Sequence, residues 1–165
     1  FADLTSAHNM VTKIASKYVY SVFVSFPNFE ERFKAYHQVP LRPLVAVLID
    51  DMVDMKKFRA IAGKLNMAYP VWFLIFTGSN DNESCEVCQN PVGNPFNLKL
   101  NSRFLVFCCN ATVIEEWWSK DRLITSRKPY GRLEAGRSRI KWLSKKSTIA
   151  RRAELGSELS VVIVN

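Results

Sequence analysis

Apolar and polar residues follow one another along this chain in patterns that predict helices and strands. The clearest helix covers Asp51–Asn66, where apolar residues recur at intervals of three and four and therefore line one face. Two continuous apolar runs, Leu44–Asp50 and Tyr69–Phe76, have the length of buried strands. The order strand, helix, strand predicts a right-handed crossover and a parallel sheet.

The same patterns assign the remaining segments. Apolar residues at helical spacing predict a helix over Asp3–Lys17, and Asn28 with Glu31 forms the capping-box pattern of a helix that reaches Tyr36. The other expected elements are strands at Tyr18–Phe26, Arg103–Cys109 and Leu159–Val164, and a helix at Ala111–Trp118 with Asn110 as its N-cap. We therefore expect an α/β fold, a mostly parallel sheet with flanking helices.

A long polar loop, Thr77–Asn97, separates two of the expected strands and exceeds the ordinary length of a connection. It contains Cys85 and Cys88, while Cys108 and Cys109 follow in the next strand. Such a loop needs a covalent staple, and structural disulfides to the neighbouring strand are the interpretation that we favour. Four cysteines allow three pairings, and the sequence leaves these open, together with a buried thiol for one of the adjacent pair.

Zinc binding and redox catalysis are the two alternatives for these cysteines. A zinc site needs a second spaced pair or nearby histidines, but Cys108 and Cys109 are adjacent and His8 and His37 are distant in sequence. A redox pair opens a helix directly after a strand, whereas eight residues separate Phe76 from the first cysteine. We expect no metal site, and both histidines are interpreted as surface residues.

Two N-x-[ST] sequons lie in the same region. They begin at Asn82 and Asn110, which are candidate glycosylation sites. Beside paired cysteines, sequons favour an oxidising and glycosylating compartment, and hence an extracellular location. The chain starts at Phe1 without a signal-peptide pattern, so we expect a fragment whose secretory signal was removed or not included.

Catalytic motifs are missing from the sequence. It has no glycine-rich phosphate loop, no G-x-S-x-G and no H-E-x-x-H. Asp50 and Asp51 end a strand where α/β proteins bind ligands, but a helix cap explains them more simply. We therefore expect a non-enzymatic protein with no catalytic residue and no cofactor.

Charge is concentrated in one part of these 165 residues, whose length fits about one domain. Of the net charge of +8, residues 120–152 carry +10, which leaves the rest nearly neutral. Because glycine, proline and serine accompany the charges, we expect an irregular solvated connector there. The alternative is an intracellular module that binds nucleic acid through this segment, with Trp142 stacking on a base. No apolar run approaches the ~20 residues of a membrane helix.

The order of several motifs resembles the amino-terminal extracellular region of insect chemosensory ionotropic receptors, a branch of the ionotropic glutamate receptors. The segments that carry this resemblance are Tyr69–Phe76, the loop Cys88–Leu98 with its turn Gly93–Phe96, Phe104–Cys108 with Ile114–Trp118, and Arg151–Gly156 with Leu159–Val164. None of these motifs is catalytic.

The resemblance implies a subunit of a ligand-gated cation channel on the extracellular side of the plasma membrane. Such a subunit works with co-receptor subunits, and a small odorant binds to a domain that would lie outside this fragment. Residues 1–119 would form a reduced periplasmic-binding-protein-like lobe for folding, assembly and trafficking. Residues 120–157 would be the basic connector, and residues 158–165 the first strand of a ligand-binding domain.

Overall fold

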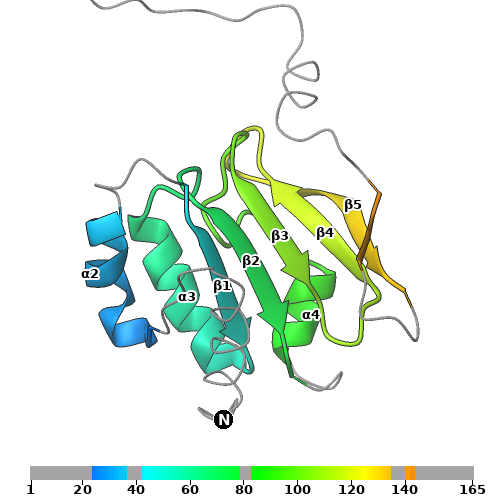
Figure 1. The fold of residues 1–165 in the computed structure, drawn as a ribbon, viewed down its shortest axis with the longest axis horizontal. Coiled ribbons are helices and arrows are strands. Elements are labelled where there is room, and N and C mark those ends of the chain that lie inside the picture. Colours follow the sequence, from blue (N-terminus) through cyan, green and yellow to red (C-terminus); the bar gives the residue numbers. More distant parts are fainter. Residues whose placement is uncertain (1–23, 37–41, 79–82, 135–139, 144–165) are drawn as a thin grey trace, which may run out of the picture.

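The computed structural model describes residues 24–36, 42–78, 83–134 and 140–143 (Figure 1). The helix expected at 3–17 and the strand expected at 159–164 lie outside these ranges, as does most of the strand expected at 18–26. The elements are α2 (Phe26–Tyr36), β1 (Leu44–Ile49), α3 (Met52–Lys64), β2 (Val71–Phe76), α4 (Glu83–Gln89), β3 (Arg103–Phe107), β4 (Val113–Trp118), β5 (Ser126–Leu133) and β6 (Ile140–Trp142).

The strands of the described ranges form one six-stranded sheet in sequence order (Figure 1). β1, β2 and β3 are parallel, with Leu74 opposite Val47 on one side and Val106 on the other. β4, β5 and β6 are antiparallel to their neighbours. The α/β fold and the predicted β1-α3-β2 crossover are confirmed. The sheet as a whole is mixed, however, because the antiparallel strands occupy half of it.

α3 begins where the sequence predicts. The Asp51 side chain caps it, since Oδ1 accepts hydrogen bonds from the backbone N–H groups of Val53 at 2.8 Å and Asp54 at 2.9 Å. This arrangement satisfies two of the amides that every helix leaves unpaired at its start. The cap explanation for the acidic pair is confirmed at Asp51.

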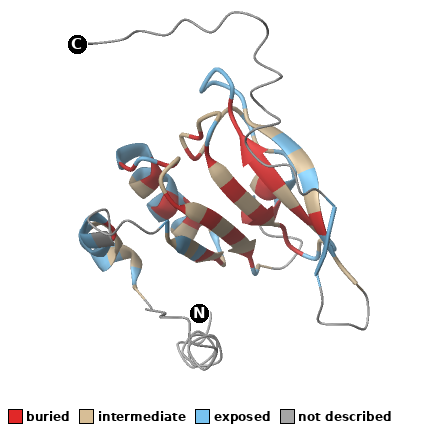
Figure 2. Ribbon diagram, turned by 45° about the horizontal axis from the view of Figure 1, so that its top comes forward, coloured by how far each residue is buried: buried red, intermediate tan, exposed pale blue. Residues whose placement is uncertain are grey.

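The core lies between the helices and one face of the sheet, with Trp72 of β2 near its centre. The Trp72 ring centroid is 5.7 Å from that of Phe33 in α2 and 5.5 Å from that of Phe58 in α3. Its indole N–H donates to the carbonyl of Met67 at 3.0 Å. Successive residues along the strands alternate between buried and half-buried, as the bands in Figure 2 show. The helices therefore cover one face of the sheet.

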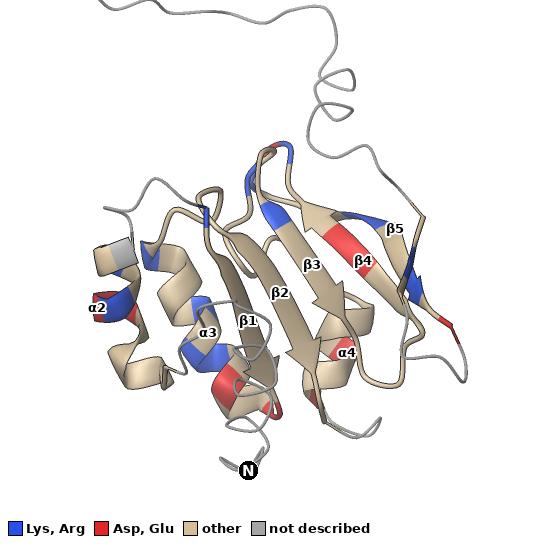
Figure 3. Ribbon diagram, viewed as in Figure 1, with Lys and Arg blue, Asp and Glu red and all other residues tan. Residues whose placement is uncertain are grey.

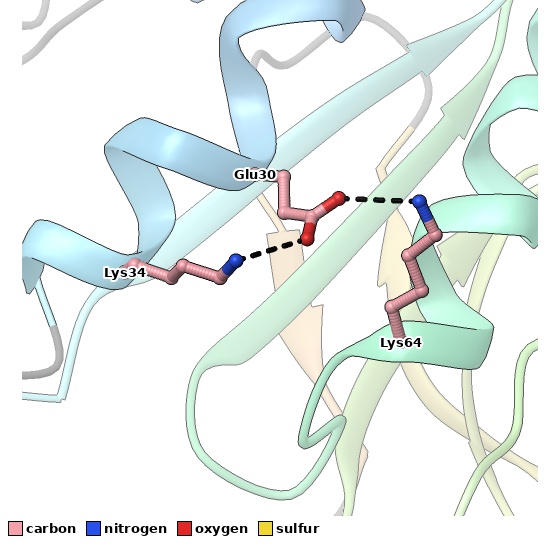
Figure 4. Close-up of polar contacts among 3 residues, drawn as sticks. All are labelled: Glu30, Lys34 and Lys64. Atoms are coloured by element: carbon pink, nitrogen blue, oxygen red, sulfur yellow. Dashed lines mark hydrogen bonds and ion pairs between the residues drawn. The ribbon is translucent and has the colours of Figure 1, made fainter.

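α2 lies beside α3, since rings of both helices pack on Trp72 and an exposed ionic group joins the two helices. The carboxylate of Glu30 lies 3.1 Å from Lys34 in the same helix and 3.4 Å from Lys64 of α3 (Figure 4). These ammonium groups lower the pKa of Glu30, Lys34 contributing first and Lys64 next. Exposed ion pairs contribute little, so the packing of both helices on Trp72 contributes more to holding α2 in place.

The helix predicted at Ala111–Trp118 is wrong, because residues 113–118 form strand β4. β4 hydrogen-bonds to β3 on one side and β5 on the other. Asn110 does not cap a helix; it adopts a left-handed φ of 51° in the turn that precedes the strand. Val113, Ile114 and the two tryptophans have side chains that favour strands, and pairing on both sides decides the outcome.

The irregular connector predicted from residue 120 is also wrong in part. Residues 126–133 and 140–142 form β5 and β6, which continue the sheet of the preceding segment. A register shift beside Ile114 leaves Tyr130 as an extra residue in β5, next to Pro129. Because proline cannot donate a hydrogen bond to the ladder, such a bulge is where a strand tolerates it.

The long loop after β2 contains an element that the sequence did not reveal. Residues 83–89 form the short helix α4, with Glu83 and Glu86 in its first turn. Acidic side chains there are favourable because they oppose the positive end of the helix dipole. Cys85 and Cys88 therefore lie on a helix and not on an extended loop.

Candidate functional site

The four cysteines join α4 to the end of β3. Cys85 and Cys88 are three residues apart on α4, which places them on one face of the helix. Cys85 pairs with Cys109 and Cys88 with Cys108, and in each pair the Cα atoms are 5.7 Å apart, within the usual range for a disulfide. All four side chains are buried. The predicted structural disulfides are present, and neither member of the adjacent pair is a free thiol.

This pairing changes what the cysteines can do chemically. Cys85 and Cys88 each bond to a different strand residue and not to one another, so the C-x-x-C pair does not form the redox-active disulfide. Zinc binds thiolates, and no free cysteine occurs among the described residues. Within those ranges no group of three His, Cys, Asp or Glu is arranged to hold a metal. His8 and His37 lie outside them.

Arg127 of β5 reinforces the same corner of the molecule. Its Nη1 donates to the carbonyl of Gln89, the last residue of α4, at 2.6 Å and lies 3.7 Å from Oε2 of Glu115 in β4. A cation at this end of a helix interacts favourably with the helix dipole. The contact therefore joins α4, β4 and β5 beside the disulfides.

A shallow hollow lies at this corner. Its lining residues are Gln89, Cys108, Ala111, Val113, Glu115 and Arg127. The charged members pair with one another or with backbone, and the cysteine is in a disulfide. This lining offers a ligand no nucleophile and no acid–base pair. We call the two disulfides together with the contacts of Arg127 the clamp. These contacts hold α4 against β3, β4 and β5.

Asn110 lies in the turn next to the clamp. The turn is closed by the N–H of Ala111, which donates to the carbonyl of Cys108 at 3.1 Å. Asn110 and Thr112, the first and last residues of the sequon, are both exposed. An exposed turn is accessible to the glycosylation machinery, so Asn110 stays a predicted acceptor. The other candidate, Asn82, lies outside the described residues.

Asp50 and Asp51 both accept hydrogen bonds from groups of the protein. Asp51 is engaged by the first amides of α3, and Asp50 Oδ1 accepts a hydrogen bond from the Thr77 hydroxyl at 3.2 Å. That bond ties the ends of β1 and β2 together. The structure thus gives both carboxylates a structural partner.

Acidic residues of β4 face basic residues of β5, as Figure 3 shows. Lys128 lies 3.6 Å from the buried carboxylate of Glu116, and its Nζ is 5.5 Å from the ring centroid of Trp118. Lys128 and Arg127 therefore both form ion pairs with acidic residues of β4. These pairs were not predicted from the sequence, although two adjacent acids and two adjacent bases with ten residues between them form a pattern that cross-strand pairing would produce.

Arg42 is a second residue that the sequence did not single out. Its guanidinium donates to the carbonyls of Tyr69 at 2.8 Å, Ala68 at 2.9 Å and Pro70 at 3.3 Å. Burial, and then repulsion from Arg103, lower its pKa. This side chain holds the loop between α3 and β2 in place.

Comparison with family profiles, with curated proteins and with solved structures finds no match to this chain. Among the described residues, no helix has the length and apolar character needed to cross a membrane. The disulfides indicate an oxidising environment, such as that of extracellular or secreted proteins.

Proposed function

We propose that this chain is the amino-terminal extracellular region of a chemosensory ionotropic receptor, a subunit of a ligand-gated cation channel. The α/β domain would act without catalysis, in folding, assembly and trafficking of the subunit. A small odorant would bind to a further domain, and co-receptor subunits would complete the channel. Its location would be the extracellular face of the plasma membrane.

The clamp is the observation that carries this proposal. Two buried disulfides hold a helix that follows β2 against the end of β3, in the region where the receptor-like motifs lie in sequence. Disulfides persist in oxidising compartments, and the Asn110 sequon lies on an exposed turn beside them. A structural clamp without reactive groups supports a role in folding and assembly.

The parallel half of the sheet supports the finer proposal of a reduced periplasmic-binding-protein-like lobe. β1, α3, β2, α4 and β3 follow one another as parallel strands with helical crossovers, which is the organisation of α/β domains. The nucleic-acid alternative receives less support, because Arg127 and Lys128 pair with acidic residues of β4.

The complete transcript tests the proposal. A receptor subunit requires a signal peptide before Phe1 and apolar segments of about 20 residues after Asn165. A start codon directly before Phe1 together with a stop codon after Asn165 would overturn it.

Surface delivery of the complete subunit, expressed with a co-receptor, tests the role of the domain. Replacing Cys88 and Cys108 together by serine should reduce the biotinylated surface fraction. The exposed Val92→Ala, in a nearby loop, is the matched control and should leave that fraction unchanged.

A further inference from the structure

Two exposed aliphatic side chains follow one another in the turn between β4 and β5. Leu123 is 71% exposed and Ile124 is 64% exposed. The turn, residues 119–125, lies beyond the ends of these two strands in Figure 1. We call Leu123 and Ile124 the apolar tip. Single exposed aliphatic residues are ordinary, but two in succession on a turn of fixed shape indicate a surface with a partner.

Hydrogen bonds fix the shape of this turn. Oδ1 of Asp121 accepts from the backbone N–H groups of Leu123 at 2.8 Å and Ile124 at 3.1 Å. The side chain of Asn94 donates to the carbonyl of Arg122 at 3.0 Å. Arg122 has a φ of 65°, in the left-handed region that residues other than glycine rarely adopt. Strained backbone of this kind persists where its surroundings hold it, and it is concentrated in functional segments.

The neighbouring loop anchors the turn to the body of the domain. Thr125 donates to the carbonyl of Gly93 through its N–H at 2.8 Å and through its hydroxyl at 2.7 Å. Asn94 also donates to the carbonyl of Leu98 at 2.9 Å, and the side chain of Leu98 is fully buried. The apolar tip is therefore held in solvent by a framework that reaches the core. Such preorganisation lowers the cost of binding an external surface.

Basic side chains border the apolar tip. Lys120 and Arg122 lie in the same turn and are exposed (Figure 3). Asp121, between them, is engaged by two amides of the turn. Anionic phospholipids attract such cations, and aliphatic groups gain free energy when they enter the headgroup layer. The charge and the polarity of the turn are therefore complementary to an anionic membrane surface.

The small size of the apolar tip favours a membrane over a folded protein as the partner. A stable protein–protein interface buries about 800 Å² on each partner, over roughly 20–30 residues. Two side chains on a projecting turn provide far less than that. A bilayer needs no matching surface, because binding to it depends on the apolar area that enters and on the attraction between charges.

We propose that the turn between β4 and β5 docks the domain on an anionic phospholipid surface. The apolar tip enters the headgroup layer, and Lys120 and Arg122 lie against lipid phosphates. Binding is reversible and weakens as salt is added, because salt screens the attraction of the cations. This inference does not rest on the receptor proposal, since it follows from the turn alone.

Sedimentation of the full chain with sucrose-loaded vesicles tests the proposal. Vesicles of equal parts phosphatidylserine and phosphatidylcholine should bind the chain at least about tenfold more tightly than vesicles of phosphatidylcholine alone. Leu123→Ser together with Ile124→Ser should weaken binding to the anionic vesicles by about tenfold or more, because the tip can no longer insert. Val53→Ser, at an exposed position of α3, is the control and should leave binding unchanged. Equal binding of the serine pair and the unmodified chain overturns the proposal.

A charge variant separates docking through the turn from attraction by the chain's net positive charge. Arg122→Gly removes one cation and suits the left-handed backbone, so the turn keeps its shape. It should weaken binding to the anionic vesicles about fivefold. Arg59→Gln makes the same change of charge at an exposed position of α3 and should weaken binding less than about twofold. Equal effects of the two substitutions contradict the proposal.

Sedimentation equilibrium without lipid tests the other partner that an apolar turn could have, a second copy of the chain. The proposal predicts that the chain and its Leu123→Ser, Ile124→Ser variant have the same mass in solution. A dimer that the two serine substitutions dissociate would assign the apolar tip to self-association and overturn the proposal.

Discussion

Cys88 and Cys108 form a disulfide that joins the last turn of α4 to the residue directly after β3, with their Cα atoms 5.7 Å apart. The bond between Cys85 and Cys109 encloses it, because the two pairs are nested along the chain. Nesting means that either bond alone already closes most of the loop. The stabilisation that the two supply is therefore shared and not additive.

Removing both disulfides should thus cost more than twice what removing one costs. Closing a loop of 20–24 residues contributes about 3 kcal/mol in the chain-entropy account. A variant with serine at Cys88 and Cys108 keeps the outer loop closed, so it should lose only the smaller part of this stabilisation. A variant with serine at all four cysteines should lose all of it. Urea unfolding measures both. If removing one disulfide and removing both lowered the free energy of unfolding equally, the shared stabilisation described above would be contradicted.

Among the residues of the core between the helices and the sheet, Trp72 should be the one whose replacement destabilises the protein most. It is fully buried and contacts rings from α2 and α3, so Trp72→Ala should lower the free energy of unfolding by about 3–5 kcal/mol. Trp142→Ala is the matched control, since that ring is 53% exposed on β6, and should cost about 1 kcal/mol. Similar losses at both positions would contradict the assignment of the core.

Asp51→Ala should remove the cap of α3 and lower the free energy of unfolding by about 1 kcal/mol. Asp51→Ser keeps an oxygen that can accept from the amides of Val53 and Asp54, and should recover most of the loss. Thermal unfolding followed by circular dichroism measures both variants. A serine variant as unstable as the alanine variant would argue against capping.

Asp121 should make the turn between β4 and β5 sensitive to acid. Its Oδ1 accepts hydrogen bonds from the amides of Leu123 and then Ile124, and these lower the pKa of the carboxyl group. A lowered pKa means that the contribution is complete above the ordinary aspartate value of about 3.9 and is lost as the pH falls through the folded value.

Nuclear magnetic resonance titration of the Asp121 carboxyl carbon checks this expectation. Asp121→Asn should flatten the dependence of stability on pH below about 4, because it removes the group that titrates. A titration midpoint of Asp121 at or above the ordinary aspartate pKa would contradict the hydrogen bonds from Leu123 and Ile124.

The first half of the described chain could be predicted because its signals are local. Apolar runs the length of a strand set β1 and β2, and helical periodicity with an aspartate cap sets α3. Disulfide bonding followed from four cysteines around an overlong loop. The exact pairing did not, because it depends on α4, a seven-residue helix too short to show periodicity.

The second half could not be predicted because its strands depend on pairing between distant segments. Six residues, Val113–Trp118, span fewer than two helical turns, so their pattern does not separate a helix from a strand. Ser126–Leu133 has no apolar alternation, and it forms a strand by pairing with β4, where Arg127 and Lys128 form ion pairs with Glu115 and Glu116. Gly131 leaves room for Ile140 and Trp142, since a Cβ there would lie 3.1 Å from atoms of both.

The most direct test of an extracellular, disulfide-clamped domain is peptide mapping, without reduction, of the chain secreted from insect cells. We predict one peptide pair joined by Cys85–Cys109 and Cys88–Cys108, and glycan on Asn110. Four free thiols and no glycan on Asn110 or Asn82, in a chain that carries zinc removable by a chelator, would contradict the account.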